Sequence, residues 1–200
     1  MVHCCRCCAC HLVCVKKKVV TVESVTNLSG VGGTSVTSTP VVNIPVATVT
    51  EVSGIVKLDV GNVKPTGVKW NNPLNIRISS NEWQGKLPVN QNKNGNFEEF
   101  TDLDYGVRAG VKNLTTYNNR GLNTLDKIIN TWAPVSENNT KSYIDFVAKS
   151  LSVTSVTVLN LKDKGIMASL VSAMSIIEKG KNQSVPVGYV LNVIDRFNLL

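Results

Sequence analysis

The chain has 200 residues and a formal net charge of +7, which suits one domain of ordinary size with an appendage. No apolar stretch reaches the roughly 18–20 residues that cross a membrane, so we expect no transmembrane segment. The basic charge fits a polyanionic partner such as nucleic acid, anionic lipid or a bacterial wall polymer, with a generic basic surface as the alternative. No nucleic-acid-reading motif is present, however, and the aromatic residues do not alternate with a basic stripe, which argues against nucleic acid.

The first segment, residues 1–18, is a cysteine-rich leader that we expect to be disordered. Its six cysteines all lie at or before Cys14, and several pairs have the C-x-x-C spacing that chelates Zn²⁺. The set we consider for a metal is Cys4, Cys7, Cys10 and Cys14. A zinc finger needs a second ligand pair after a longer loop, and none follows. A metal site, reversible acylation and a spuriously translated leader stay open, and we expect no cofactor.

The second segment, residues 19–66, is rich in Val, Thr, Ser and Gly and contains no aromatic residue. Its β-branched residues favour an extended chain, but strict alternation occurs only in patches, and Pro40 and Pro45 interrupt it. We therefore expect an extended or β arm, with a flexible linker as the alternative. Arms of this kind often add a strand to another subunit.

The third segment, residues 67–200, has the spacing of a small mostly-α domain. Thr101 and Asp104 form a helix-start signal for the first helix, residues 102–120. Asn123 or Thr124 is expected to cap a second helix, which Pro134 ends. The apolar face of that second helix is expected to carry Trp132 inward.

Three further helices complete the predicted domain. Asn139 or Thr140 should cap the third, which ends near residue 151. The fourth should span residues 163–177, with Ile177 among its inward residues and a glycine stop behind it. Pro186 is expected in the first turn of the fifth. The SENN stretch, residues 136–139, is then an exposed turn between two packed helices.

Several short motifs in this domain occur in a distinctive order. The motifs are NNPLNIR (71–77), close to NNPGNIR; WQG (83–85); FEEF (97–100); YGVRA (105–109), close to GIRA; and WAP (132–134) followed by ENNT (137–140). This order is similar to that of a family of phage virion or structural proteins. The resemblance covers about residues 68–180 and extends more distantly to lysozyme and lytic transglycosylases. It implies a lysozyme-like domain in the virion, with other virion proteins and host peptidoglycan as partners.

Two positions depart from the family pattern. Leu74 replaces a glycine of the NNPGNIR motif. Near the end of the fourth helix the pattern is roughly Ala-Met-x-x-His-Glu-x-Gly, and here the glutamate is kept as Glu178 while Ile177 stands where the histidine would be.

Carboxylate chemistry is the catalytic chemistry that the domain can supply. Residues 67–200 contain no histidine and no cysteine, which excludes Ser-His-Asp and Cys-His nucleophiles and a His-ligated zinc site. Cleavage of a sugar chain needs an acid of raised pKa and usually a second carboxylate. A transglycosylase works with one acid where the substrate supplies the nucleophile.

Glu178 is the first catalytic candidate, because it follows an apolar helix and partial burial would raise its pKa. A solvated last-turn glutamate is the alternative. Glu99 and Glu137 are the other candidates. Glu98 and Glu99 stand between two phenylalanines, so at least one should face solvent, and Asp104 is expected to serve the helix start.

The expected substrate-binding residues are Trp83, Arg77, Arg108 and Asn138. Trp83 lies in a polar run and would stack on a sugar ring. The arginines would bind an acidic glycan or, as the alternative, pair with Asp104 or Glu137 to stabilise the fold.

Three functions remain after these arguments. The first is a virion-associated protein that acts on or binds host peptidoglycan, as a lytic transglycosylase or glycoside hydrolase if it is an enzyme. The second is a structural minor virion protein without activity. The third, a packaging protein associated with nucleic acid, is supported by net charge alone.

Overall fold

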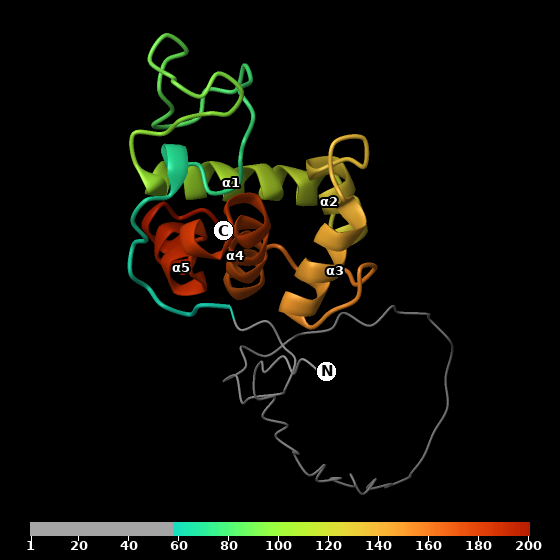
Figure 1. Cartoon of the computed structure of the whole chain (residues 1–200). Helices are drawn as coiled ribbons and strands as arrows, with labels where there is room; N and C mark the ends of the chain where they lie inside the picture. Colours follow the sequence, from blue (N-terminus) through green and yellow to red (C-terminus); the bar gives the residue numbers. More distant parts are fainter. Residues whose placement is uncertain (1–57) are drawn as a thin grey trace, which may run out of the picture. The chain divides into compact units, whose positions relative to one another are not determined.

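The computed structural model describes residues 58–200, and these form a bundle of helices (Figure 1). The helices are α1 (Leu103–Asn119), α2 (Leu125–Trp132), α3 (Thr140–Leu151), α4 (Lys164–Lys179) and α5 (Val187–Arg196), with single 3-10 turns η1 (Lys69–Asn71) and η2 (Lys181–Gln183). Residues 58–200 contain no strand, and only two isolated antiparallel bridges join their loops. The mostly-α prediction is confirmed. The leader and residues 19–57 of the arm lie outside the described residues.

Side-chain caps set most of the helix starts. Thr124 caps α2, Asn139 caps α3 and Asp163 caps α4, each accepting a hydrogen bond from a first-turn backbone N–H. The predicted start of α1 is wrong by one residue. Asp102 is the cap, and its carboxylate accepts from the backbone N–H of Asp104 at 2.8 Å, whereas Thr101 remains outside the helix.

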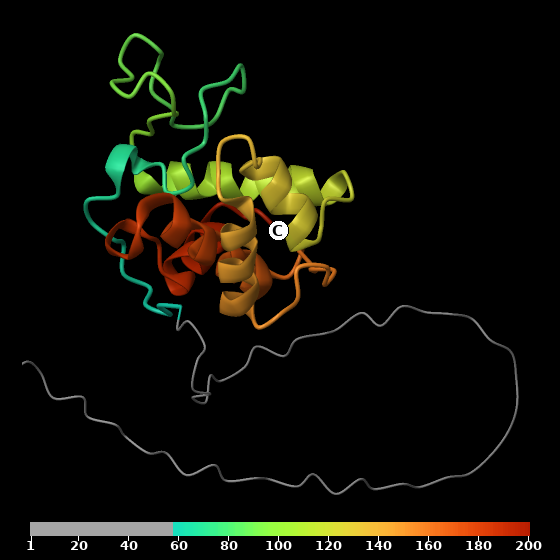
Figure 2. The same ribbon diagram turned by 45° about the vertical axis from the view of Figure 1, so that its right-hand side comes forward.

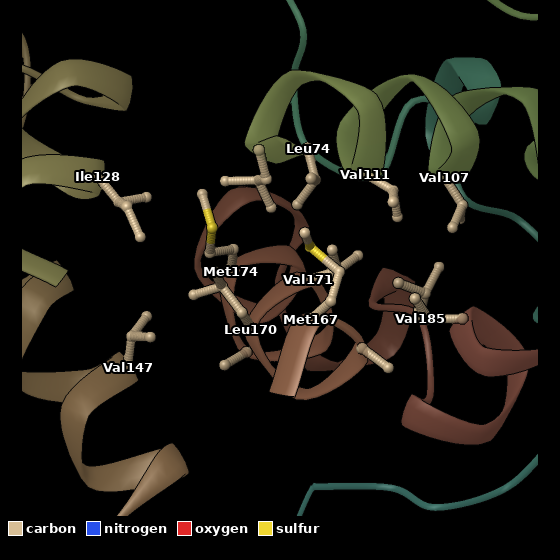
Figure 3. Packing of buried hydrophobic residues seen from close by; sticks show 14 of the residues in the cluster. Leu74, Val107, Val111, Ile128, Val147, Met167, Leu170, Val171, Met174 and Val185 are labelled. Atoms are coloured by element: carbon tan, nitrogen blue, oxygen red, sulfur yellow. The ribbon is translucent and has the colours of Figure 1, made fainter. Parts of the chain in front are cut away.

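Helix α4 forms the centre of the bundle, and Figures 1 and 2 show the other helices arranged around it. It packs against α1, α3 and α5. Because neighbours cover it on several sides, its buried residues are not confined to one stripe. Figure 3 shows Met167, Leu170, Val171 and Met174 of α4 directed toward residues of the surrounding elements. All four are fully buried.

The NNPLNIR segment lies against the start of α1, which explains why two glycines face it. A Cβ atom on Gly106 would lie 1.8 Å from the backbone oxygen of Asn71, and one on Gly110 would lie 2.6 Å from Leu74. Asn72 is fully buried and donates to the carbonyl oxygens of Ile76 and Glu98 at 3.0 and 2.8 Å. Close approach and buried hydrogen bonds therefore fix this loop on the bundle.

Residues 58–66 contact α5 and the start of α1. The backbone N–H of Val187 donates to the carbonyl oxygen of Asp59 at 2.7 Å, and Tyr189 donates likewise to Gly61 at 3.1 Å. Lys64 forms an ion pair with Asp102. This stretch, which the composition assigned to the arm, therefore packs on the helices.

Two predicted side-chain or turn positions are wrong, and Trp132 is as expected only in part, since it packs against the core but remains half-buried. Ile177 is 40% exposed rather than inward. Pro186 precedes α5 as its cap residue instead of standing in the first turn. In residues 58–200 no helix is long and apolar enough to span a membrane.

Candidate active site

Glu178 lies in the last turn of the central helix α4, and its side chain is half-buried. Its carboxyl group lies where three segments meet: the NNPLNIR loop, the end of α2 and the start of α3. The group is thus surrounded by protein while part of it remains accessible. This is the placement that the apolar sequence before Glu178 predicted.

Three neutral donors from those segments reach the Glu178 carboxyl group. Asn75 Nδ2 donates to Oε2 at 2.9 Å, and it also donates to the backbone oxygen of Glu178 at 3.0 Å. Oε1 accepts from Tyr143 OH at 3.0 Å and from Trp132 Nε1 at 3.2 Å. Asn75 has a positive φ of 49°, a conformation that asparagine tolerates better than most residues. Both carboxyl oxygens are therefore held in a fixed orientation.

Burial raises the pKa of the Glu178 carboxyl group above its ordinary value. The hydrogen bonds from Asn75, Tyr143 and Trp132 favour the charged form and lower the pKa, but the loss of solvation outweighs them. Burial and the neighbouring Glu178 also raise the pKa of the Tyr143 hydroxyl well above its ordinary value, so this hydroxyl stays protonated and acts as a donor. The arrangement yields an oriented carboxylic acid that holds its proton to a higher pH than an exposed glutamate.

Two other predicted residues, Arg77 and Glu137, form an ion pair with each other. It joins the NNPLNIR loop, which also contacts Glu178, to the turn between α2 and α3. The Arg77 guanidinium also lies 5.8 Å from the centroid of the Phe97 ring. Both charged side chains are more than half exposed. The alternative prediction for Arg77, a stabilising pair with Glu137, is the arrangement that the structure shows.

Glu98 and Glu99 have different surroundings from Glu178. Glu98 is buried and accepts from the backbone N–H of Ser79 at 3.2 Å, whereas Glu99 is half-buried and accepts from that of Lys93 at 3.1 Å. Both carboxylates thus bind loop backbone in residues 79–99. Neither joins the hydrogen-bonded group around Glu178.

The remaining predicted substrate-binding residues are spread over the domain. Trp83 is half-buried against the core, and its buried indole Nε1 has no hydrogen-bond partner among residues 58–200. The Arg108 guanidinium lies 5.9 Å from the centroid of the Phe197 ring. Asn138 is exposed in the turn after α2. Asp104 bonds to Tyr189 and Arg196 instead of pairing with Arg108.

Sequence reasoning missed Asn75 as a partner of Glu178 and assigned Trp132 and Tyr143 to the core. Each of the two aromatic residues has a polar atom at its tip, and buried Trp and Tyr usually place that atom on a partner. Trp132 and Tyr143 flank the joint between two helices, so this rule could have predicted that their polar atoms share a hydrogen-bond partner there. Nothing in the local pattern links Asn75 to a residue 103 positions away.

An open hollow of about 310 Å³ lies elsewhere, between α2 and α3. Its lining includes Asp126, Lys141 and Asp145 but none of the predicted site residues. Asp145 pairs with Lys141, and Asp126 accepts from Ser155 at 3.2 Å, so both carboxylates have partners. We place the candidate site at Glu178, where the titrating group and its oriented donors are. Residues 58–200 hold no cluster of His, Cys, Asp and Glu suited to a metal, and the leader cysteines lie outside them.

Comparison with known proteins adds a phage relative. No family model matches the chain. Protein P5 of Pseudoalteromonas phage PM2 is 38% identical to it over 125 residues, which cover 60% of this chain and 75% of the relative. The identity and coverage are sufficient to establish common membership, so the chain belongs to the family of phage proteins that includes this Protein P5.

Proposed function

We propose that this protein is a virion component that cleaves the glycan strands of host peptidoglycan as a lytic transglycosylase, with Glu178 as its acid. The observation that carries the proposal is the Glu178 carboxyl group, which is half-buried, oriented by three neutral donors and raised in pKa. A group of this kind holds its proton to a higher pH than an exposed glutamate does, which suits it to proton transfer. The phage relative supports the virion as its location and other virion proteins as its partners.

Among residues 58–200, no second carboxylate joins the Glu178 group, which favours a transglycosylase over a hydrolase. Glu137 is engaged with Arg77, and Glu99 binds the loop backbone. Hydrolysis with retention or inversion uses two carboxylates. A lytic transglycosylase avoids this need because the substrate's own hydroxyl group serves as the nucleophile.

The proposed reaction begins with proton transfer from Glu178 to the glycosidic oxygen on C4 of N-acetylglucosamine. The bond from that oxygen to C1 of N-acetylmuramic acid breaks, and the C6 hydroxyl of the same muramoyl residue forms a new bond to C1. The hydroxyl proton passes to the Glu178 carboxylate, which restores the acid. The products are a shorter strand and a 1,6-anhydromuramoyl end. Tyr143, Trp132 and Asn75 stabilise the carboxylate that exists between the two proton transfers.

The test compares Glu178→Gln with the wild-type protein in clearing a suspension of cell walls. Glutamine keeps the size of the side chain and removes the proton, so we expect clearing to be lost while the thermal unfolding transition is retained. Glu82→Gln is the matched control, because this side chain is 88% exposed and lies outside the site. Glu99→Gln and Glu137→Gln examine the other two acids in the same assay. Undiminished clearing by Glu178→Gln refutes the assignment.

A structural role without catalysis is the second candidate, and one observation favours it. The two oxygens of Glu178 tie together the NNPLNIR loop, α2 and α3, as a stabilising cross-link would. In that case the wild-type protein does not clear walls at all, and Glu178→Gln lowers its stability.

A further inference from the structure

Three lysines gather where helix α4 ends, and we call them the lysine cluster: Lys69, Lys179 and Lys181. Lys179 directly follows Glu178, and Lys181 begins the η2 turn. The backbone N–H of Lys69 donates to Gln183 Oε1 at 3.2 Å, which places η1 beside η2. The cluster therefore combines two segments that are more than 100 positions apart in the sequence.

No acidic side chain of residues 58–200 forms an ion pair with the lysine cluster. The six ion pairs in that part of the chain use Lys64, Arg77, Lys86, Lys141, Lys164 and Arg196. Lys69 instead lies 5.2 Å from the centroid of the Trp70 ring. Burial lowers the pKa of the Lys179 amine, and the like charge of Lys69 lowers it further, whereas Glu178 raises it. The cluster is thus a concentration of positive charge at the edge of the candidate site.

The helix dipole explains only part of this cluster. A cation in the last turn of a helix is stabilised by the partial negative charge there, which accounts for Lys179. Lys69 belongs to a different segment, and its positive charge repels that of Lys179, which destabilises the fold. An arrangement of this kind is useful where an anionic ligand binds.

We infer that the lysine cluster binds the carboxylates of the stem peptides of peptidoglycan, so that the protein selects glycan that still carries its peptides. This inference rests on the proposed function. The N-acetylated sugars are neutral, and the lactyl carboxyl group of muramic acid is joined to the peptide by an amide bond. The negative charges of the polymer are therefore carried by the peptides. Because Glu178 and Lys179 lie close enough for their charges to influence each other's pKa, a peptide on the muramoyl residue at the acid is within reach of the cluster.

The experiment measures binding separately from cleavage. The full chain carrying Glu178→Gln is sedimented with intact sacculi and with glycan strands from which an amidase has removed the peptides. We expect at least about fivefold tighter binding to intact sacculi, since charge contacts to two exposed lysines and one half-buried lysine each contribute a small free energy. This preference should shrink at high ionic strength. Adding Lys69→Gln, Lys179→Gln and Lys181→Gln should reduce binding to the level seen with peptide-free glycan.

The matched control removes the same charge elsewhere, through K93Q, K149Q and K162Q, and should bind as the parent does. Equal binding of the parent to both glycans, or equal losses in the two triple variants, overturns the inference. Lysine-dependent binding to duplex DNA or to anionic phospholipid vesicles, without a preference for intact sacculi, also overturns it. If the wild-type protein releases no products but the lysine-dependent preference persists, the transglycosylase proposal fails and peptide recognition stands.

Discussion

Replacing Tyr143 by phenylalanine removes one donor from Glu178 and leaves the buried ring in place. The hydroxyl donates to Glu178 Oε1 at 3.0 Å, and the residue is 4% exposed. This bond is stronger when the carboxyl group is ionised than when it is protonated. The variant should therefore lose more stability at high pH than at low pH, and the pKa of Glu178 should rise further.

The magnitude follows from the two forms of the bond. A hydrogen bond to a charged group contributes about 1.5–3 kcal/mol, and one between neutral groups about 0.5–1.5 kcal/mol. Because Glu178 is partly exposed, the lower part of each range applies, and the difference is about 1 kcal/mol. Linkage converts this difference into a rise of about 0.7 unit in the folded-state pKa.

Urea unfolding at about pH 4 and about pH 8 measures the two stabilities, and a pH titration of the Glu178 carboxyl carbon by NMR measures the pKa. The two experiments must agree, since both report the same free-energy difference. Tyr117→Phe is the control, because Tyr117 packs its ring on Trp132 without joining the Glu178 hydrogen bonds. A loss in Tyr143→Phe that is equal at both pH values, with an unchanged pKa, would refute the reasoning.

Three further predictions concern the site and its support. Glu178→Gln should gain stability relative to the wild type as pH rises above about 4.5. The pKa of Glu178 is raised in the folded state, so ionisation of this group destabilises the wild-type fold above that pH. Parallel curves of stability against pH for the two proteins would contradict this. Gly106→Ala should lower the free energy of unfolding, measured in urea, by at least about 2 kcal/mol, because its Cβ would lie 1.8 Å from a backbone oxygen of η1. Gly95 has a positive φ but open space around it, so Gly95→Ala should lower the free energy of unfolding by only about 1 kcal/mol. A double-mutant cycle on Arg77 and Glu137 should give a coupling below about 1 kcal/mol that shrinks in high salt, because both side chains are exposed.

The sequence predicted those parts of the fold that local chemistry determines. Thr124 and Asn139 precede their helices as side-chain caps, and the apolar run before Glu178 predicted its partial burial. The start of α1 was misplaced because Thr101 and Asp102 are both acceptable caps, and tertiary contacts decide between them. Ile177 matches the apolar spacing of α4, but periodicity does not reveal which positions of a helix the neighbouring elements cover.

The candidate site depends on contacts that local patterns do not encode. Glu178 receives its donors from residues 103, 46 and 35 positions earlier in the chain. The pairing of Arg77 with Glu137 was one of several pairings that spacing allowed. The acid itself was therefore predictable, whereas its donor set and the lysine cluster required the three-dimensional arrangement.

The measurement that tests the central claim most directly is mass spectrometry of the soluble products that the full chain releases from purified peptidoglycan. We predict fragments with 1,6-anhydromuramoyl ends from the wild-type protein and none from Glu178→Gln. Reducing ends would contradict the transglycosylase mechanism, because they form when water and not the C6 hydroxyl attacks C1. No products from a folded wild-type sample would contradict catalysis itself and leave Glu178 as a cross-link between the NNPLNIR loop and the helices.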